Sequence, residues 1–190
     1  MTVRVNDVDK LRTWLPGLNP VCRLTKETKT KSPYEELFKK CLLELGIQAS
    51  YEPFSMVVMG GYRREITYTP DFVAMNLRVN TRLLVLEPHM MYNRTGWELR
   101  AKLSGLKHFR SITNSMFYLV VASDIGEQML KSRAEMDPSG SFDAYWTLPV
   151  INPWSSRGYH SAEEIVKQRL RVLELNPKTS TESLKCQARK

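Results

Sequence analysis

The segment from Ile66 to Met91, ITYTPDFVAMNLRVNTRLLVLEPHMM, constrains the fold more than any other part of the chain. Its aliphatic run at residues 83–86 is typical of a strand buried within a sheet. Two acids interrupt the apolar pattern: Asp71 directly follows a proline, and Glu87 directly follows the aliphatic run. Acidic side chains are rarely buried unless they are paired or bind a metal. We therefore expect these acids either to mark strand ends or to form a site.

The pattern on either side of this segment predicts one α/β domain at residues 32–175, between an N-terminal extension (1–31) and a flexible basic C-terminal tail (176–190). Residues 32–46 predict a helix with Ser32 as its N-cap, Pro33 in its first position and Gly46 at its end. The element order α-β-β-β-α-β, followed by α-β-α, predicts a central mixed sheet flanked by helices. Strands are expected at 51–58, 64–75, 81–90, 115–123 and 142–150, turns at 60–61 and 76–80, and further helices at 95–112, 124–133 and 161–173.

Prolines bear on two of the expected strands, and a possible capping box bears on the last expected helix. Pro88 is expected to limit the strand at 81–90, and Pro149 makes the strand at 142–150 a candidate edge strand. Ser161 and Glu164 form a plausible capping box for the last helix.

Charge and composition narrow the classes of partner and of cellular setting. The chain has 190 residues, with 28 Lys and Arg against 20 Asp and Glu, and a formal net charge of +8. This excess favours a polyanionic partner, either nucleic acid or an anionic membrane. No segment approaches the roughly 18 apolar residues of a membrane span, and the N-terminus has no apolar core of signal-peptide type. The three cysteines are widely spaced and form no CxxC pair. We expect an intracellular protein, cytoplasmic or nucleoid-associated, or nuclear in a eukaryote.

The two acids are placed where a metal could bind. Pro70 cannot donate a hydrogen bond to a sheet, so the backbone beside Asp71 is expected at an edge or a bend. Strand alternation puts Glu87 and His89 on one face. Two strand-borne acids that converge repel each other and need a cation, and hard oxygen ligands suit Mg²⁺ or Mn²⁺. Such a metal can polarise a phosphodiester and lower the pKa of a bound water.

With these residues in this order, the stretch from Ser32 to Ala122 resembles the PD-(D/E)xK nuclease superfamily. Pro70-Asp71 matches the first motif, and Glu87-Pro88-His89 matches the second. The helix at 32–46 resembles the family's leading helix, which often supplies a third acid. The resemblance implies a restriction-endonuclease-like fold, one or two divalent metals and phosphodiester hydrolysis. It implies metal ligation by Asp71 and Glu87, with Glu35 as third acid in preference to Glu36.

The second motif departs from the family, because His89 stands where the lysine is expected. A lysine ammonium can position the attacking water and stabilise developing negative charge, and a histidine does so only when it is protonated. Lys102 or Lys107 of the following helix are the alternative helpers. The basic face of that helix would bind the phosphate backbone of DNA, or would be an ordinary solvated face. Its residues are Arg100, Lys102, Lys107 and Arg110.

The resulting interpretation is a divalent-metal-dependent DNA endonuclease, with RNA not excluded and no membrane partner. One site per chain would favour a homodimer for cutting both strands. Two alternatives stay open: a nucleic-acid-binding protein on the same fold without catalysis, and a protein-interaction module whose acids are structural. Individual acids also have structural alternatives. Asp71 could bond a turn, Glu87 could pair with Arg82 or Arg94, and Glu35 could complete a capping box with Ser32.

Overall fold

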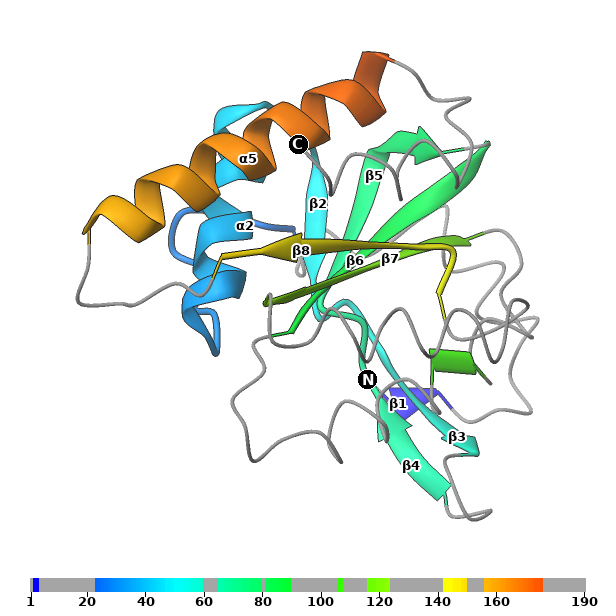
Figure 1. The fold of residues 1–190 in the computed structure, drawn as a ribbon. Helices are drawn as coiled ribbons and strands as arrows, with labels where there is room; N and C mark the ends of the chain where they lie inside the picture. Colours follow the sequence, from blue (N-terminus) through cyan, green and yellow to red (C-terminus); the bar gives the residue numbers. More distant parts are fainter. Residues whose placement is uncertain are drawn as a thin grey trace.

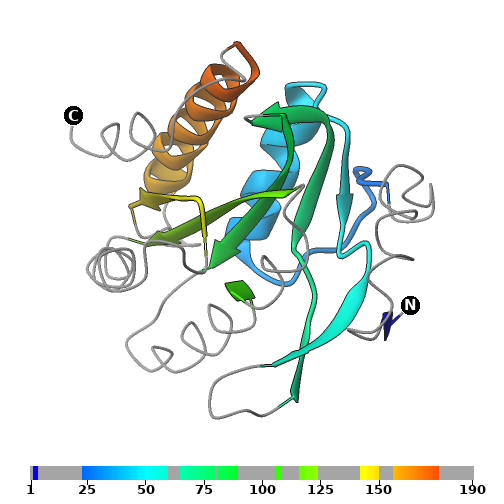
Figure 2. The same ribbon diagram turned by 90° about the vertical axis from the view of Figure 1, so that its right-hand side faces the viewer.

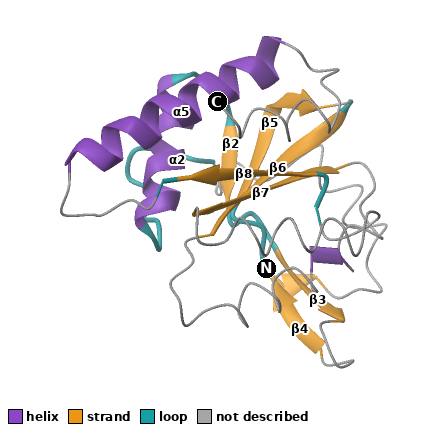
Figure 3. Cartoon of the chain, viewed as in Figure 1, coloured by secondary structure: helices purple, strands orange, loops and turns teal. Residues whose placement is uncertain are grey.

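The computed structural model describes residues 2–3, 23–59, 65–79, 81–89, 106–107, 116–123, 142–149 and 156–175. The fold is α/β, with a five-stranded mixed sheet and two helices packed against it (Figures 1 and 3). None of the helices within these ranges is both long enough and apolar enough to cross a membrane. The elements are β1 (Thr2–Val3), α2 (Pro33–Glu44), β2 (Ala49–Tyr51), β3 (Ser55–Met59), β4 (Glu65–Tyr68), β5 (Phe72–Val79), β6 (Arg82–His89), β7 (Met116–Ser123), β8 (Ala144–Leu148) and α5 (Ser156–Leu175).

The main sheet has the strand order β2-β5-β6-β7-β8. β5 pairs antiparallel with both β2 and β6. β7 pairs parallel with β6, and β8 pairs parallel with β7. The predicted mixed sheet is therefore confirmed, as is β8 as an edge strand. β6 lies at the centre of the sheet, as its aliphatic run predicted.

Helix α2 forms as its sequence predicts. The Ser32 hydroxyl accepts a hydrogen bond from the backbone N–H of Glu35 over 3.2 Å, and Pro33 occupies the first turn, where its missing N–H costs nothing. Gly46 follows the helix with φ of 69°, a left-handed conformation that glycine adopts without steric cost. The helix thus has both of the ends that the sequence predicts.

Both helices cover the same face of the main sheet. Alternate residues of the central strands, such as Leu84 and Leu86 of β6, join the apolar faces of α2 and α5 in one buried cluster. Leu24 belongs to this cluster, so residues preceding the predicted domain boundary at 32 contribute to the core. The intervening residues of the strands, such as Val85, are also buried but face the opposite side. The main sheet is therefore buried on both faces.

A second, three-stranded sheet of order β1-β3-β4 extends away from the main one (Figures 1 and 2). The strands expected at 51–58 and 64–75 were each wrong as single strands, because each is divided between the two sheets. The first divides at Glu52, which has φ of 45°, and the second at residues 69–71. The two crossings lie side by side, since the N–H of Glu52 donates to the carbonyl of Asp71 over 2.9 Å.

Two further expectations for the strands need correction. Residues 76–79 belong to β5 rather than to a turn, because Leu77 and Val79 are buried and a register irregularity accommodates them. Pro88 does not end β6, since β6 pairs with β7 through His89. The opposing β5 ladder begins only opposite Leu86, so no partner on that side needs an N–H from Pro88.

Helix α5 begins at Ser156, so that Ser161 and Glu164 lie within it and form no capping box. It also extends past the expected end at Leu173, to Leu175. The helix expected at 95–112 lies outside the described residues except at 106–107, which are helical, and the helix expected at 124–133 and the tail at 176–190 lie wholly outside them.

Candidate metal site

Asp71 and Glu87 each adjoin the last pair of the β5–β6 ladder. Phe72 of β5 pairs with Leu86 of β6, Asp71 directly precedes Phe72, and Glu87 directly follows Leu86. Glu87 lies within β6, whereas Asp71 lies at the bend that leads into β5. The two acids that the sequence singles out therefore stand next to each other in register, at the end of the antiparallel ladder.

Both acids are buried, and Glu87 points away from α2 and α5. Leu86 belongs to the helix-side cluster, and strand alternation turns its neighbour Glu87 to the other face. Asp71 and Glu87 are 8% and 1% exposed, respectively. Carboxylates at this depth need strong compensation, from hydrogen bonds, positive charge or a cation.

Glu87 has one compensating partner that the sequence analysis did not identify. The hydroxyl of Tyr68, at the end of β4, donates to Glu87 Oε1, and the tyrosine is itself 3% exposed. Burial, together with the charge of Glu87, raises the pKa of Tyr68 well above its usual range, so the phenol stays protonated and remains a donor. The expected alternative partner of Glu87, Arg82, instead pairs with Asp143 at 3.0 Å.

Glu35 is held by four bonds at the start of α2. Its backbone N–H donates to Ser32 Oγ, and its carboxylate accepts from Ser32 Oγ (3.1 Å), from the backbone N–H of Lys31 (2.9 Å) and from the hydroxyl of Tyr51 (2.5 Å). The Ser32 half of the expected capping box is therefore present, whereas the Glu35 carboxylate accepts its backbone bond from Lys31, one residue before Ser32. Glu35 Oε2 receives both the Lys31 and the Tyr51 bonds, so the carboxylate has a fixed orientation.

The charge of Asp71 acts on both of the tyrosines that bond glutamates. Burial and the bond to Glu35 raise the pKa of Tyr51, and the charge of Asp71 adds to this effect. The same Asp71 charge contributes to the raised pKa of Tyr68. One carboxylate thus acts electrostatically on both tyrosines.

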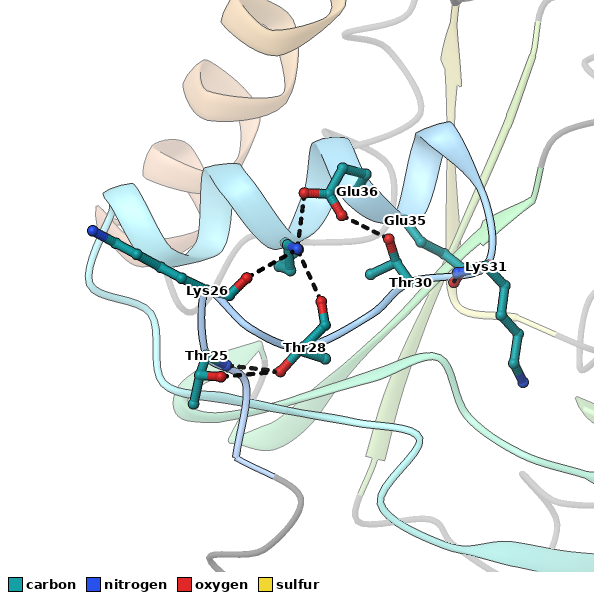
Figure 4. A network of polar contacts seen from close by, with 8 residues as sticks. Thr25, Lys26, Thr28, Thr30, Lys31, Glu35 and Glu36 are labelled. Atoms are coloured by element: carbon teal, nitrogen blue, oxygen red, sulfur yellow. Dashed lines mark hydrogen bonds and ion pairs between the residues drawn. The ribbon is translucent and has the colours of Figure 1, made fainter.

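The loop before α2 is fixed against the helix by a buried lysine. Lys39 Nζ donates to the carbonyl of Thr28 over 2.9 Å and pairs with Glu36 at 2.8 Å. Thr30 Oγ1 also donates to Glu36, at 2.7 Å. Figure 4 shows Glu36, Thr30 and neighbouring loop residues beside the first turn of α2. Glu36 is therefore bonded to Thr30 of the loop and to Lys39 of the helix.

The donor chemistry at Asp71 and Glu87 fits a hard divalent cation. Mg²⁺ is commonly held by one or two carboxylates plus waters and substrate phosphate, and these two acids supply that number. Across the parts of the chain that the structure describes, no three His, Cys, Asp or Glu side chains form a metal-holding group. The expected third acid, Glu35, does not join Asp71 and Glu87 in such a group.

The remaining predicted site residues fall largely outside the described part. Lys107 is exposed. The side chain of His89 is not described, although its backbone ends β6 beside Ala122 of β7. Three residues of the predicted basic face also lie outside the described ranges: Arg100, Lys102 and Arg110.

Sequence reasoning missed Tyr51, Tyr68 and Lys39. Tyr68 carried a weak signal, because it stands three residues before Asp71 in the same apolar segment. Tyr51 and Lys39 act through contacts between segments distant in sequence, and no local pattern indicates these. Comparisons of the chain with models of known protein families, with curated proteins and with solved structures gave no significant match.

Proposed function

We propose that the protein is a divalent-metal-dependent DNA endonuclease of the PD-(D/E)xK type on a restriction-endonuclease-like fold. The observation that carries this proposal is the end of the β5–β6 ladder at Phe72 and Leu86, directly beside the buried acids Asp71 and Glu87. Two neighbouring carboxylates in that setting repel each other, and a shared Mg²⁺ or Mn²⁺ relieves the repulsion.

The order of the elements supports the same proposal. A helix bearing an acid (α2) is followed by the β3–β4 hairpin, by Pro70-Asp71, and by a hydrophobic strand that carries Glu87 near its end. β7 then pairs parallel with β6, an arrangement that requires a crossover connection between the two strands. The order of these elements agrees with the resemblance found in the sequence.

In the proposed mechanism each acid has a separate task. Asp71 and Glu87 hold the cation, which when bound polarises a phosphodiester and acidifies a water molecule. Glu35, fixed by the cap, orients water at the edge of the site. His89, or Lys102 or Lys107, stabilises the negative charge that develops on the phosphate. The net charge of +8 favours DNA as the substrate.

A cleavage panel tests the proposal. Linear, supercoiled, single-stranded and branched DNA are each incubated with Mg²⁺, with Mn²⁺ and with chelator. We expect metal-dependent cleavage by the wild-type protein and by Glu164→Gln, which removes an exposed carboxylate on α5. Asp71→Asn and Glu87→Gln should abolish it. Cleavage that persists in both variants would refute the assignment of these acids.

The panel also separates the proposal from a binding-only protein on the same fold. The tyrosine bonds to Glu35 and Glu87 favour this second candidate, since they already stabilise both carboxylates. A binding-only protein would retain DNA in a salt-sensitive manner and cut none of the substrates with either metal.

A further inference from the structure

We infer that Tyr51 and Tyr68 are positioning residues, which orient Glu35 and Glu87 toward the site at Asp71. This inference rests on the proposed function and adds two residues outside the superfamily motifs. Tyr51 is the last residue of β2 and Tyr68 the last of β4, so each hydroxyl acts where a strand leaves its sheet.

The two pairs share one geometry. Each phenol donates to one oxygen of a glutamate, Tyr51 to Glu35 Oε2 and Tyr68 to Glu87 Oε1. An ionised carboxylate has about four lone-pair sites on two oxygens. The Tyr68 bond therefore leaves sites on Glu87 for a cation, whereas Glu35, which also accepts from Lys31 and Ser32, keeps about one site for a water. The bond nevertheless fixes the rotation of the carboxylate, because a hydrogen bond to a charged acceptor is short and directional.

A tyrosine suits this task better than a lysine or an arginine would. A cation beside Glu87 would neutralise it and weaken its hold on a metal, whereas a phenol adds no charge. Burial and the charge of Glu87 both keep Tyr68 protonated, so it remains a donor at every pH at which the protein works. The same holds for Tyr51, where burial and the Glu35 bond raise the pKa.

The packing of each ring explains how the hydroxyl is held. The Tyr51 ring contacts that of Phe72, its cross-strand partner, with centroids 5.1 Å apart. Phe72 directly follows Asp71, so the ring that orients Glu35 rests on the strand that carries Asp71. Tyr68 is buried almost completely. Neither hydroxyl can move far from its carboxylate without repacking the interior.

The test is Mn²⁺ binding, measured by calorimetric titration of the full chain after treatment with chelator. Tyr68→Phe and Tyr51→Phe each remove one oxygen. Tyr34→Phe is the matched control, because Tyr34 is buried and its hydroxyl donates to the carbonyl of Pro149 over 2.9 Å. Removing a group that orients a metal ligand typically costs 10–100-fold in metal affinity.

We expect Tyr68→Phe to bind Mn²⁺ 10–100-fold more weakly than wild type, and Tyr51→Phe to lose less, because Glu35 acts through water. Tyr34→Phe should bind as wild type does, even where it unfolds at a lower temperature. Cleavage by Tyr68→Phe should recover toward the wild-type rate at saturating Mn²⁺, as a positioning role requires and a general loss of structure does not.

The possible results distinguish the positioning role of the tyrosines from the proposed metal site itself. Wild-type affinity in Tyr68→Phe overturns the positioning role while leaving the metal site intact. An equal loss in Tyr34→Phe overturns it too, since the effect is then one of stability. If Tyr68→Phe fails to fold, the Mn²⁺ affinity of Tyr51→Phe tests the positioning role instead, because Tyr51 is partly exposed. A wild-type protein that binds no Mn²⁺ overturns both the positioning role and the proposed function.

Discussion

The backbone N–H of Glu52 donates to the carbonyl of Asp71 over 2.9 Å, which joins the two places where the chain passes from one sheet to the other. A second bond, 2.6 Å between the hydroxyls of Ser55 and Thr69, closes the same junction. The backbone of Asp71 is therefore fixed from outside its own strand. These bonds hold the bend at which Asp71 lies, next to the end of the β5–β6 ladder that leads to Glu87.

The backbone at Glu52 is strained, and a substitution can measure that strain. Its φ of 45° lies in the left-handed region, which costs a residue with a Cβ about 1–2 kcal/mol. Glu52→Val should lower the free energy of unfolding in urea relative to Glu52→Asn by about 1 kcal/mol, because asparagine tolerates this conformation and a β-branched residue does not. Both variants remove the ion pair with Lys31, so their difference isolates the backbone. Equal stabilities would contradict this expectation.

The serine cap of α2 should contribute measurably to the stability of the fold. Ser32→Ala removes the hydroxyl that bonds both the N–H and the carboxylate of Glu35, and we expect a loss of about 1 kcal/mol in thermal unfolding. Ser32→Thr keeps the hydroxyl and should lose only a few tenths. A result in which the two variants are equally stable would show that the cap contributes nothing.

Acid should weaken the junction between α2 and α5. Burial opposes ionisation of Glu163, but bonds from Lys167 (2.5 Å) and Lys40 (2.8 Å) outweigh it and hold the pKa of this carboxyl below its usual range. A carboxyl with a depressed folded-state pKa stabilises the fold above its unfolded pKa, and this is lost as the pH falls through the folded value.

Glu163→Gln should therefore be less stable than wild type at pH 7, and the difference should shrink as the pH falls below about 4. Unfolding by urea at several pH values measures this, with the exposed neighbour Glu164→Gln as the control. A difference that stays constant down to pH 2 would rule out the ionised pairing.

The proposed phosphate contacts of the basic face have a distinct signature. Replacing Lys102 and Lys107 with alanine should weaken DNA binding and flatten its dependence on salt by up to about two phosphate contacts. Arg171→Ala, an exposed cation on α5, is the comparison variant. An unchanged slope in the double variant would identify an ordinary solvated face.

The sequence predicted the parts of the fold that local patterns determine. Helix α2 has its serine cap, proline and terminal glycine, and β6 has its aliphatic run at the centre of the sheet. The single strands predicted at 51–58 and 64–75 were wrong. The division of a strand between two sheets depends on which strands pair. Pairing is a property of distant segments, and an alternating apolar pattern continues unchanged through such a division.

The candidate site shows the same limit. Asp71 and Glu87 could be found because acids in an apolar segment are conspicuous, and strand alternation set the face of Glu87. Tyr51 and Tyr68 could not be assigned to the site from the sequence. A tyrosine in a strand is most often part of the packing, and only the tertiary contact reveals the partner of its hydroxyl. The cap of Glu35 was foreseen from Ser32, whereas its bonds to Lys31 and Tyr51 were not.

The central claim is that Asp71 and Glu87 share a divalent cation, and thermal unfolding with and without Mn²⁺ tests it most directly. A ligand that binds only the folded state stabilises it by about 2.7 kcal/mol at a hundred times its dissociation constant. We expect Mn²⁺ to raise the unfolding temperature of the wild type, and to leave Asp71→Asn and Glu87→Gln unmoved. In chelator both variants should be at least as stable as wild type, because each relieves the repulsion between the acids. An absent shift in the wild type, or an equal shift in the two variants, would contradict the claim.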